Sequence, residues 1–360
     1  MEVIRDWFRR HLSDPQVIGL AAVLLVGFIT IYLAGNMLAP VLASVIIAYL
    51  LEGVVSYFAR LGVPRFPSVL LVFAAFLAFL VFVIFGLMPL LSRQATQLFQ
   101  QLPTMIAQGQ DALLTLPERY PKLFSEEQVR DLISALRAET LGFGQRVVTI
   151  SFASVVGFIA WIVYLILMPL MVFFFLKDKD QIVGWIIGFL PEDRTLLGQV
   201  WRDVDLQIGN YVRGKFVEII IIWVATYITF AFMGLQFSML LGVVVGLSVL
   251  IPYIGAVTVT IPVAVVAYFQ WGFTGDFAWL LIAYAIIQAV DGNLLVPLLF
   301  SEAVNLHPVA IIVSILIFGG LWGFWGVFFA IPLATLVQAV LKAWPRLGGS
   351  NPPDQDIAAA

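Results

Sequence analysis

Long runs of apolar residues, separated by short polar stretches, extend along most of the sequence. Four such runs fill the first half of the chain: residues 16–34, 37–59, 68–90 and 147–176. An α-helix needs roughly 20 apolar residues to cross the hydrocarbon core of a bilayer. We therefore predict that all four runs are membrane-spanning helices. Gly35 and Asn36 separate the first two runs and predict a turn that makes them a hairpin.

The apolar runs of the second half are interrupted by helix-breaking residues. They cover residues 216–233, 238–269, 278–299 and 307–344. Proline removes a backbone donor and crowds the carbonyl one turn earlier, so we predict a break near Pro252. Backbone groups freed inside lipid need protein or a water-filled cavity as a partner, so such breaks indicate substrate or ion sites. The residues predicted to break or open the membrane helices are Pro252, Gly255, Pro262, Gly292, Pro297, Gly323, Gly326 and Pro332.

The polar stretches and the charges complete the predicted organisation. Ser125 to Gln128 resemble a capping box that opens an amphipathic helix in the Gln-rich stretch 92–146. If the spans alternate, 13 of the 19 Lys and Arg residues fall on one side, which predicts that both termini are cytoplasmic. The predicted segments are a cytoplasmic N-terminal tail (1–15), transmembrane helices 1–3 (16–91), an extracytoplasmic helical segment (92–146), transmembrane helix 4 (147–176), a cytoplasmic amphipathic segment (177–215), a transmembrane core with broken helices (216–344) and a disordered C-terminal tail (345–360).

Composition places the chain among membrane proteins and narrows its chemistry. Of the 360 residues, 62% are hydrophobic and 11% are charged, and the mean hydropathy is +1.02, so the fold class is all-α and polytopic with the lipid bilayer as a partner. There is no cysteine and only two histidines, His11 and His307, so we expect no metal and no cofactor. The net charge of −3 argues against nucleic-acid binding. The motifs of zinc proteases, serine hydrolases and phosphate-binding loops are absent, so we do not expect an enzyme.

Few ionisable residues fall at membrane depth, where facing lipid is costly. They are Glu52, Glu218, Asp291, Glu302 and His307. Asp291 is the leading candidate for function, because Tyr284, Gln288 and Asp291 recur at helical spacing and form a polar stripe. Asp291 would bind a cation, a substrate or a proton; the structural alternative is a capped helix end or a hydrogen bond between helices.

Two groups of candidate residues follow from these patterns. The predicted substrate- or ion-binding residues are Tyr253, Tyr284, Gln288, Asp291 and Asn293. The residues expected at a gate or rim are Arg213, Lys215, Glu218, Glu302 and His307. Lys215 and Glu218 are three residues apart and can pair on one helix face, which we interpret as an ion pair at the membrane interface. For Glu52, at the end of a predicted span, we expect a structural role.

Several stretches together resemble the autoinducer-2 exporter family of bacterial permease-like proteins. They are Phe173–Asp178, Tyr211–Lys215, Ile251–Gly255, Asp291–Pro297, Leu306–Pro308 and Gly323–Pro332. The resemblance covers nearly the whole chain apart from residues 92–146. It implies an eight-span, homo-oligomeric protein of the bacterial inner membrane, in a family linked to export of the quorum-sensing signal autoinducer-2 and, in some members, to sodium-proton antiport. The family often has Glu in place of Asp291 and Gln in place of Lys215, which leaves the substrate open.

We therefore expect a secondary transporter that exports a small solute and couples to a cation or proton gradient. In this hypothesis, the breaks near Tyr253 and Asn293 line one polar cavity, and Asp291 supplies the coupling charge. One alternative is a sodium-proton antiporter, and another is a non-transporting oligomeric scaffold or passive pore. An intramembrane aspartyl protease would need two facing aspartates, and Asp276 lies in a polar loop where its pairing with Asp291 is weak.

Overall fold

The computed structural model describes residues 15–114, 154–189, 195–252, 254–300 and 306–343, and across these residues the chain is helical without a strand. Five helical stretches in this part are long and apolar enough to cross a membrane. They are Met37–Arg60, Arg65–Asp111, Val200–Phe232, Ile254–Trp271 and Gly275–Phe300. The protein is therefore an all-α polytopic membrane protein, which confirms the fold class predicted from the apolar runs.

The chain divides into two compact units. The large unit comprises residues 39–179 and 215–298, and the small unit comprises residues 1–38, 180–214 and 299–360. Helices α2 (Pro15–Arg60) and α9 (Thr195–Phe232) each contribute residues to both units. Because α9 runs without interruption through Lys215, the predicted boundary between an amphipathic segment and a transmembrane core is not a helix boundary.

Helix α2 is continuous for 46 residues and passes through Gly35 and Asn36. The turn predicted at these two residues is therefore wrong. Gly and Asn each cost at most about 1 kcal/mol relative to Ala inside a helix, which is too little to end an apolar helix of this length. Pro40 is also accommodated within α2.

A second long helical stretch crosses the predicted boundary between a membrane span and the polar segment 92–146. It consists of α3 (Arg65–Phe82), the π-helical turn η1 (Val83–Leu87) and α4 (Met88–Leu114). Helix α4 contains the first part of the polar segment 92–146. Its Gln94 Oε1 accepts a hydrogen bond of 2.8 Å from the Leu240 amide, near the start of α10 (Ser238–Ser248). The helix predicted at the capping box of residues 125–128 lies outside the described residues, as does the predicted C-terminal tail.

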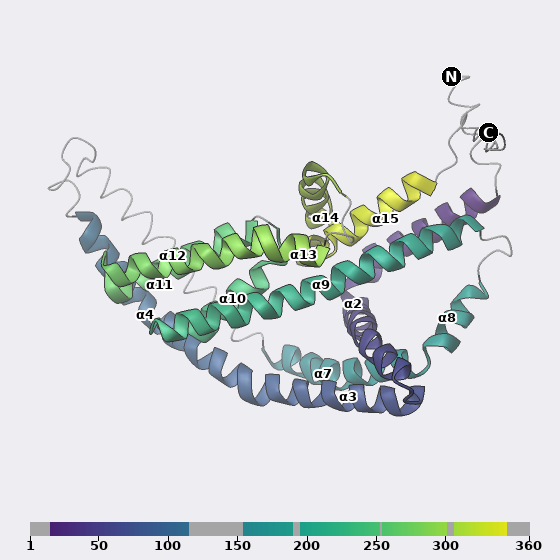
Figure 1. The fold of residues 1–360 in the computed structure, drawn as a ribbon, viewed down its shortest axis with the longest axis horizontal. Helices are drawn as coiled ribbons and strands as arrows, with labels where there is room; N and C mark the ends of the chain where they lie inside the picture. The colour runs from purple at the N-terminus through teal and green to yellow at the C-terminus, as the bar shows by residue number, and fades with distance from the viewer. Residues whose placement is uncertain (1–14, 115–153, 190–194, 253, 301–305, 344–360) are drawn as a thin grey trace, which may run out of the picture. The chain divides into compact units, whose positions relative to one another are not determined.

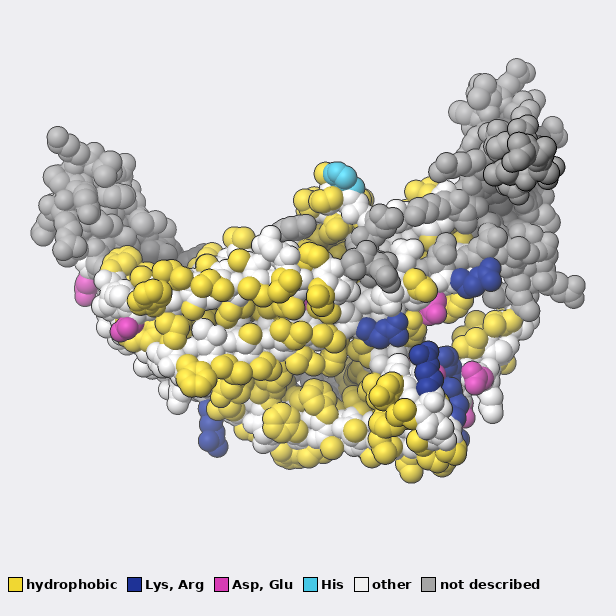
Figure 2. Space-filling view, viewed as in Figure 1, with side chains coloured by type: hydrophobic (Ala, Val, Ile, Leu, Met, Phe, Trp, Pro, Cys, Tyr) yellow, Lys and Arg dark blue, Asp and Glu magenta, His cyan; other side chains and the backbone are white. Residues whose placement is uncertain are grey.

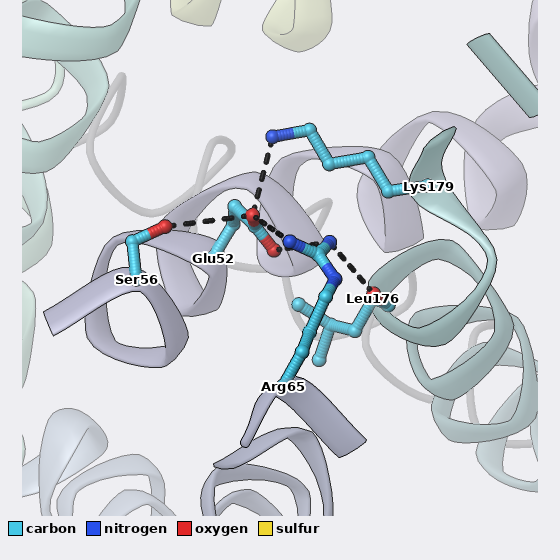
Figure 3. A network of polar contacts seen from close by, with 5 residues as sticks. All are labelled: Glu52, Ser56, Arg65, Leu176 and Lys179. Atoms are coloured by element: carbon cyan, nitrogen blue, oxygen red, sulfur yellow. Dashed lines mark hydrogen bonds and ion pairs between the residues drawn. The ribbon is translucent and has the colours of Figure 1, made fainter. Parts of the chain in front are cut away.

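Helices α2, α3 and α7 (Ser154–Lys177) pack together in the large unit. Their shared core consists of Ala48, Val55, Val69, Val72, Val172 and Leu176. At one end of this core lies a group of charged residues that we call the exposed cluster: Glu52, Arg65 and Lys179, the last at the start of α8 (Lys179–Ile187) (Figure 3). The exposed cluster therefore ties the C-terminal parts of α2 and α7 to the starts of α3 and α8.

The predicted break near Pro252 falls between α10, which ends at Ser248, and α11 (Ile254–Trp271). A Cβ atom at Gly255 would overlap the carbonyl oxygen of Ser248, so only glycine lets the two helix ends approach this closely. Pro262, in contrast, lies inside α11 and does not end it. The short α10, with 11 residues, is about half as long as a helix that spans a bilayer.

Helix α12 (Gly275–Val290) continues through the π-helical turn η2 (Asp291–Leu295) into α13 (Val296–Phe300). The opening predicted at Gly292 to Pro297 is therefore a one-turn π bulge and not an unwound segment. Hydrophobic side chains cover most of the visible surface of α11 and α12 (Figure 2), as lipid-facing helices require.

In the small unit, α14 (Pro308–Phe328) and α15 (Ala330–Ala343) pack against each other. The chain leaves helical geometry at Gly323, where φ is 58°, and a Cβ at Gly326 would overlap the carbonyl oxygen of Phe318. Pro332 lies in the first turn of α15, where its missing amide has no intrahelical acceptor to leave unpaired, so it does not break that helix.

Candidate functional site

The part of α9 that belongs to the large unit presents one buried stripe. It consists of Lys215, Glu218, Ile222, Thr226 and Phe230, which recur every three or four residues and are all buried. In Figure 1 this part of α9 and α12 run in opposite directions. Two interactions agree with that arrangement: the charge of Lys215 acts on Asp291 at one end, and the ring centroids of Phe230 and Tyr284 lie 6.2 Å apart at the other.

Lys215 and Glu218 form a buried ion pair. The distance between Lys215 Nζ and Glu218 Oε2 is 2.8 Å, and the two residues are only 7% and 1% exposed. The spacing correctly indicates that the two side chains pair, but the pair lies in the interior of the large unit and not at an exposed rim. Its burial means that neither charge can lose its partner without a large cost in free energy.

Asp291 is the third charge of this group, which we call the buried cluster. Asp291 is buried, and the charges of both Lys215 and Glu218 act across the cluster. One of its carboxylate oxygens, Oδ1, is buried and has no hydrogen-bond partner in the described part of the protein. The buried cluster therefore joins two carboxylates and one ammonium group from two helices, with one acceptor atom unused.

Gln288 and Tyr284 lie on the same face of α12 as Asp291, as the helical spacing predicts. The Tyr284 hydroxyl lies 3.3 Å from the carbonyl oxygen of Ala256 and 3.4 Å from Thr260 Oγ1, both on α11. The side-chain nitrogen of Gln288 is buried and has no hydrogen-bond partner among the described residues. A row of polar groups therefore extends along α12 from Asp291 into the helix contact with α11.

Asn293 lies apart from this row. It is exposed, and its Nδ2 donates a hydrogen bond of 2.8 Å to the carbonyl oxygen of Ala289 in its own helix. The π bulge shifts the register of backbone hydrogen bonds, and Pro297 supplies no amide hydrogen, so carbonyl groups around the bulge need side-chain donors. Asn293 provides one such donor, and the structure does not bring it together with Asp291.

The remaining candidate residues occupy other places. Tyr253 and Glu302 lie outside the described residues. Arg213, in the small unit, is exposed, and its Nη2 donates to Asn210 Oδ1 at 3.0 Å. His307 is exposed and caps α14, with Nδ1 accepting a hydrogen bond of 3.3 Å from the Val309 amide. Asp276 is exposed in the first turn of α12, more than three helical turns along the chain from Asp291.

Two residues of α9 that carry a buried polar atom are absent from the sequence-based candidates. The indole nitrogen of Trp223 and the hydroxyl of Thr226 are buried and have no hydrogen-bond partner in the described chain. Thr226 continues the stripe that contains Lys215 and Glu218, so helical spacing from those two charges would have found it. Trp223 faces the neighbouring α10, where a Cβ at Gly246 would lie 2.6 Å from Trp223 Cβ.

A metal-binding arrangement is not found in the described part of the chain, where no group of three or more His, Cys, Asp or Glu side chains comes together. The buried cluster contains only two acidic side chains and a lysine. Its chemistry is suited to binding a proton or a singly charged cation through carboxylate oxygens, and to hydrogen bonding of a polar solute.

Comparison with known proteins identifies the family. The sequence model of the AI-2E family transporters matches residues 21–346, which include every helix of the buried cluster. The chain belongs to the AI-2E transporter family. This membership confirms the resemblance indicated by the motifs, and it makes the protein a membrane transporter.

Relatives in this family match the chain over most of its length. A protein of Escherichia coli K12 named "Putative permease PerM" is 48% identical over 345 residues, which cover 96% of this chain and 98% of the relative. A Bacillus subtilis protein named "Putative transport protein YueF" is 27% identical over 315 residues, covering 86% of this chain and 84% of the relative. Another from the same organism, "Putative transport protein YrrI", is 24% identical over 309 residues and covers 86% of both chains.

Proposed function

We propose that this protein is a secondary transporter that exports a small solute and couples this movement to a proton or cation gradient through the buried cluster. The observation that carries the proposal is Asp291: a buried carboxylate whose Oδ1 has no partner among the described residues and which lies within electrostatic reach of the buried ion pair of Lys215 and Glu218. Ionisable groups inside membrane helices are costly and are usually retained for substrate or ion pathways.

The charges of the buried cluster favour the binding of one proton or one monovalent cation. Two carboxylates and one ammonium group leave one negative charge without a partner when all three are ionised. A buried charge without a partner costs several kcal/mol, so a bound proton or cation at Asp291 stabilises the folded protein. Release of that ion on one side of the membrane and uptake on the other would couple transport to a gradient.

The family resemblance supports a more specific assignment. We propose autoinducer-2 as a candidate solute, because the family carries the AI-2E description, and the bacterial inner membrane as the location, with both termini in the cytoplasm. The excess of Lys and Arg in the segments assigned to the cytoplasm supports this orientation. We further propose that the protein is a homo-oligomer.

A sodium-proton antiporter is the second candidate function. The buried cluster favours it because a carboxylate site with one negative charge in excess can exchange a proton for a cation without an organic solute. The two candidates differ in what moves. Only the first requires accumulation or counterflow of a small metabolite, whereas the second predicts gradient-driven cation flux alone.

The proposal can be tested with the purified protein in proteoliposomes. Counterflow is measured for a panel of small metabolites and cations under an imposed proton or sodium gradient. Replacing Asp291 by Asn should lower gradient-driven transport about tenfold or more, because an amide neither binds a proton nor neutralises a cation. Asp276→Asn is the matched control: it changes the same chemical group at the exposed start of the same helix, and transport should be unaffected.

Two results would contradict the proposal. Equal gradient-driven transport by the Asp291→Asn variant and the unaltered protein would exclude Asp291 as the coupling group. Passive flux that neither saturates nor responds to a gradient would indicate a pore instead of a secondary transporter.

A further inference from the structure

Basic side chains gather at the end of the large unit where α2, α3 and α7 meet. Four of them, which we call the basic end, are Arg60 in the last turn of α2, Arg65 at the start of α3, Lys177 in the last turn of α7 and Lys179 just after it. Glu52 and Asp178 are the acidic side chains paired with them. Four cations against two carboxylates leave two positive charges in excess.

The other exposed charges of the large unit do not share this excess. In the part of that unit which the structure describes, they are Arg93 and Asp111 on α4 and Asp276 on α12. One cation and two carboxylates give this group one negative charge in excess. The positive excess is therefore a local property of the basic end.

The cations of the basic end have donors that the described protein does not use. Arg60 follows Glu52 and Ser56 at four-residue intervals, so it lies on the same face of α2. It is exposed, and no hydrogen bond or ion pair joins its guanidinium to another described residue. The side chains of the other three cations are 40%, 41% and 47% exposed in spite of their ion pairs. The basic end can therefore bind a further anion.

The turn between α2 and α3 holds apolar side chains beside these cations. Gly62 ends α2 in the left-handed region, with φ of 90°, and the Val63 amide donates to the Phe58 carbonyl oxygen at 3.2 Å, as in a Schellman motif. Leu61 and Phe66 are 63% and 56% exposed. The backbone of the turn is thus fixed, and it keeps two large apolar side chains outside the protein core.

The length of α2 places this turn at the membrane surface. The candidate span Met37–Arg60 has 24 residues and is about 36 Å long, slightly more than the hydrocarbon core of about 30 Å. Arg60, at its end, therefore lies at the level of the lipid headgroups. At this level apolar side chains reach the acyl chains, while guanidinium and ammonium groups stay among the phosphates.

We infer that the basic end binds the phosphate of an anionic phospholipid, whose acyl chains contact Leu61 and Phe66. Arginine matches a phosphate with two parallel N–H bonds, and lysine adds positive charge. A water-soluble acidic partner would fit the charges but would leave both apolar side chains in water, so the observations favour a lipid. This site goes beyond the proposed transport function and does not depend on Asp291.

Native mass spectrometry of the purified protein in detergent tests the inference by measuring the first lipid bound. The probes are phosphatidylglycerol, which is anionic, and phosphatidylcholine with the same acyl chains, which has no net charge. Arg60→Gln should weaken binding of phosphatidylglycerol about fivefold, the contribution of one cation near an anionic lipid surface, and leave that of phosphatidylcholine unchanged. Arg93→Gln is the matched control, because it removes the same group from an exposed position outside the basic end. It should change neither affinity.

Three results would overturn the site. Equal weakening by Arg60→Gln and Arg93→Gln would indicate attraction by overall charge alone. Equal affinity of the unaltered protein for the two lipids would show that the anionic group is not recognised. Displacement of phosphatidylglycerol by inorganic phosphate, but not by chloride at the same ionic strength, would assign the basic end to a soluble phosphate compound. Lys177→Gln gives the same comparison if Arg60→Gln does not fold.

Leu61→Ser tests the apolar part of the site separately. Because Leu61 is exposed, the variant should remain folded. It should weaken binding of both lipids by the same factor, roughly threefold or more, since the lost contact is with the acyl chains. Unchanged affinity for both lipids would contradict the contact between the turn and the acyl chains. None of these measurements uses a gradient, so their outcome is separate from that of the Asp291→Asn transport assay.

Discussion

Two clusters of charged side chains in the large unit use the same chemical groups in different surroundings. The exposed cluster joins Glu52 to Arg65 and Lys179, with distances of 3.3 Å and 3.2 Å from their nitrogens to Glu52 Oε1. The buried cluster joins Lys215, Glu218 and Asp291. In the exposed cluster the two cationic side chains are 40% and 47% exposed, whereas in the buried ion pair the side chains are 9% and 2% exposed.

The two clusters also differ in how completely their hydrogen bonds are satisfied. In Figure 3 Glu52 receives bonds from Arg65, Lys179 and Ser56, and Arg65 also donates to the carbonyl oxygen of Leu176 at 3.4 Å. Both carboxylate oxygens of Glu52 are used. Asp291 Oδ1, in contrast, has no hydrogen-bond partner in the part of the chain that the structure describes. The comparison indicates that the exposed cluster joins helix ends with the hydrogen bonds of its carboxylate satisfied, whereas the buried cluster keeps one carboxylate oxygen without a partner among the described residues.

The largest expected effect comes from Lys215→Met. It leaves two buried carboxylates without the ammonium group, and removing one partner of a buried pair typically costs about 3–5 kcal/mol. The double variant Lys215→Met/Glu218→Gln removes the orphaned charge of Glu218 as well and should recover most of that loss. Unfolding of the purified protein in detergent measures both. If Lys215→Met is as stable as the unaltered protein, the ion pair is not buried as described.

An intermediate effect is expected for Glu52→Gln in the exposed cluster. Partly exposed ion pairs contribute up to about 1 kcal/mol each, so the loss of stability should be close to 1 kcal/mol. Raising the salt concentration to about 1 M should remove most of this difference, because the screening length falls to about 3 Å. The same salt series should leave the effect of Lys215→Met nearly unchanged. Equal salt sensitivity in the two clusters would contradict the difference in burial.

The smallest effect is expected for Arg65→Lys. Lysine keeps the charge and one bond to Glu52 but cannot also reach the Leu176 carbonyl in the fork geometry of arginine. We expect a loss of stability of a few tenths of a kcal/mol, up to about 0.5 kcal/mol, and unchanged transport. Transport assays and unfolding curves of this variant beside Glu52→Gln check the order. A larger loss for Arg65→Lys than for Glu52→Gln would show that the Leu176 contact dominates the exposed cluster.

Helical spacing predicts much of the candidate site. The recurrence of Tyr284, Gln288 and Asp291 indicates one face of a helix, and that face is the buried one. The spacing of Lys215 and Glu218 likewise indicates an ion pair, and the pair is present. Spacing does not reveal burial, however, so the sequence suggested an interfacial pair where the structure shows a core pair beside Asp291.

Local hydrogen bonding explains where the described geometry differs from the arrangement expected from spacing. Asn293 follows Asp291 closely and resembles a ligand, but its amide bonds the Ala289 carbonyl within the same helix. The sequence shows that Asn293 and Pro297 lie close together. It does not show whether the helix there unwinds or forms a π bulge, because that depends on which donors bond to the carbonyl groups left free. Gly35 and Asn36 are typical of turns, but their low helix propensity is a weak local preference. In α2 the helix continues through both residues.

The sequence by itself determined the all-helical membrane fold, the family and the residues that carry charge into the apolar helices. These follow from local properties: run length, helical periodicity and the high cost of unpaired polar groups in lipid. The tertiary structure alone decided that the charge of Lys215 on α9 acts on Asp291 in η2, that the Lys215–Glu218 pair is buried, and that Gly255 fits against Ser248. Contacts between segments distant in the sequence depend on which helix faces pack together, and the apolar pattern of each helix permits many such packings.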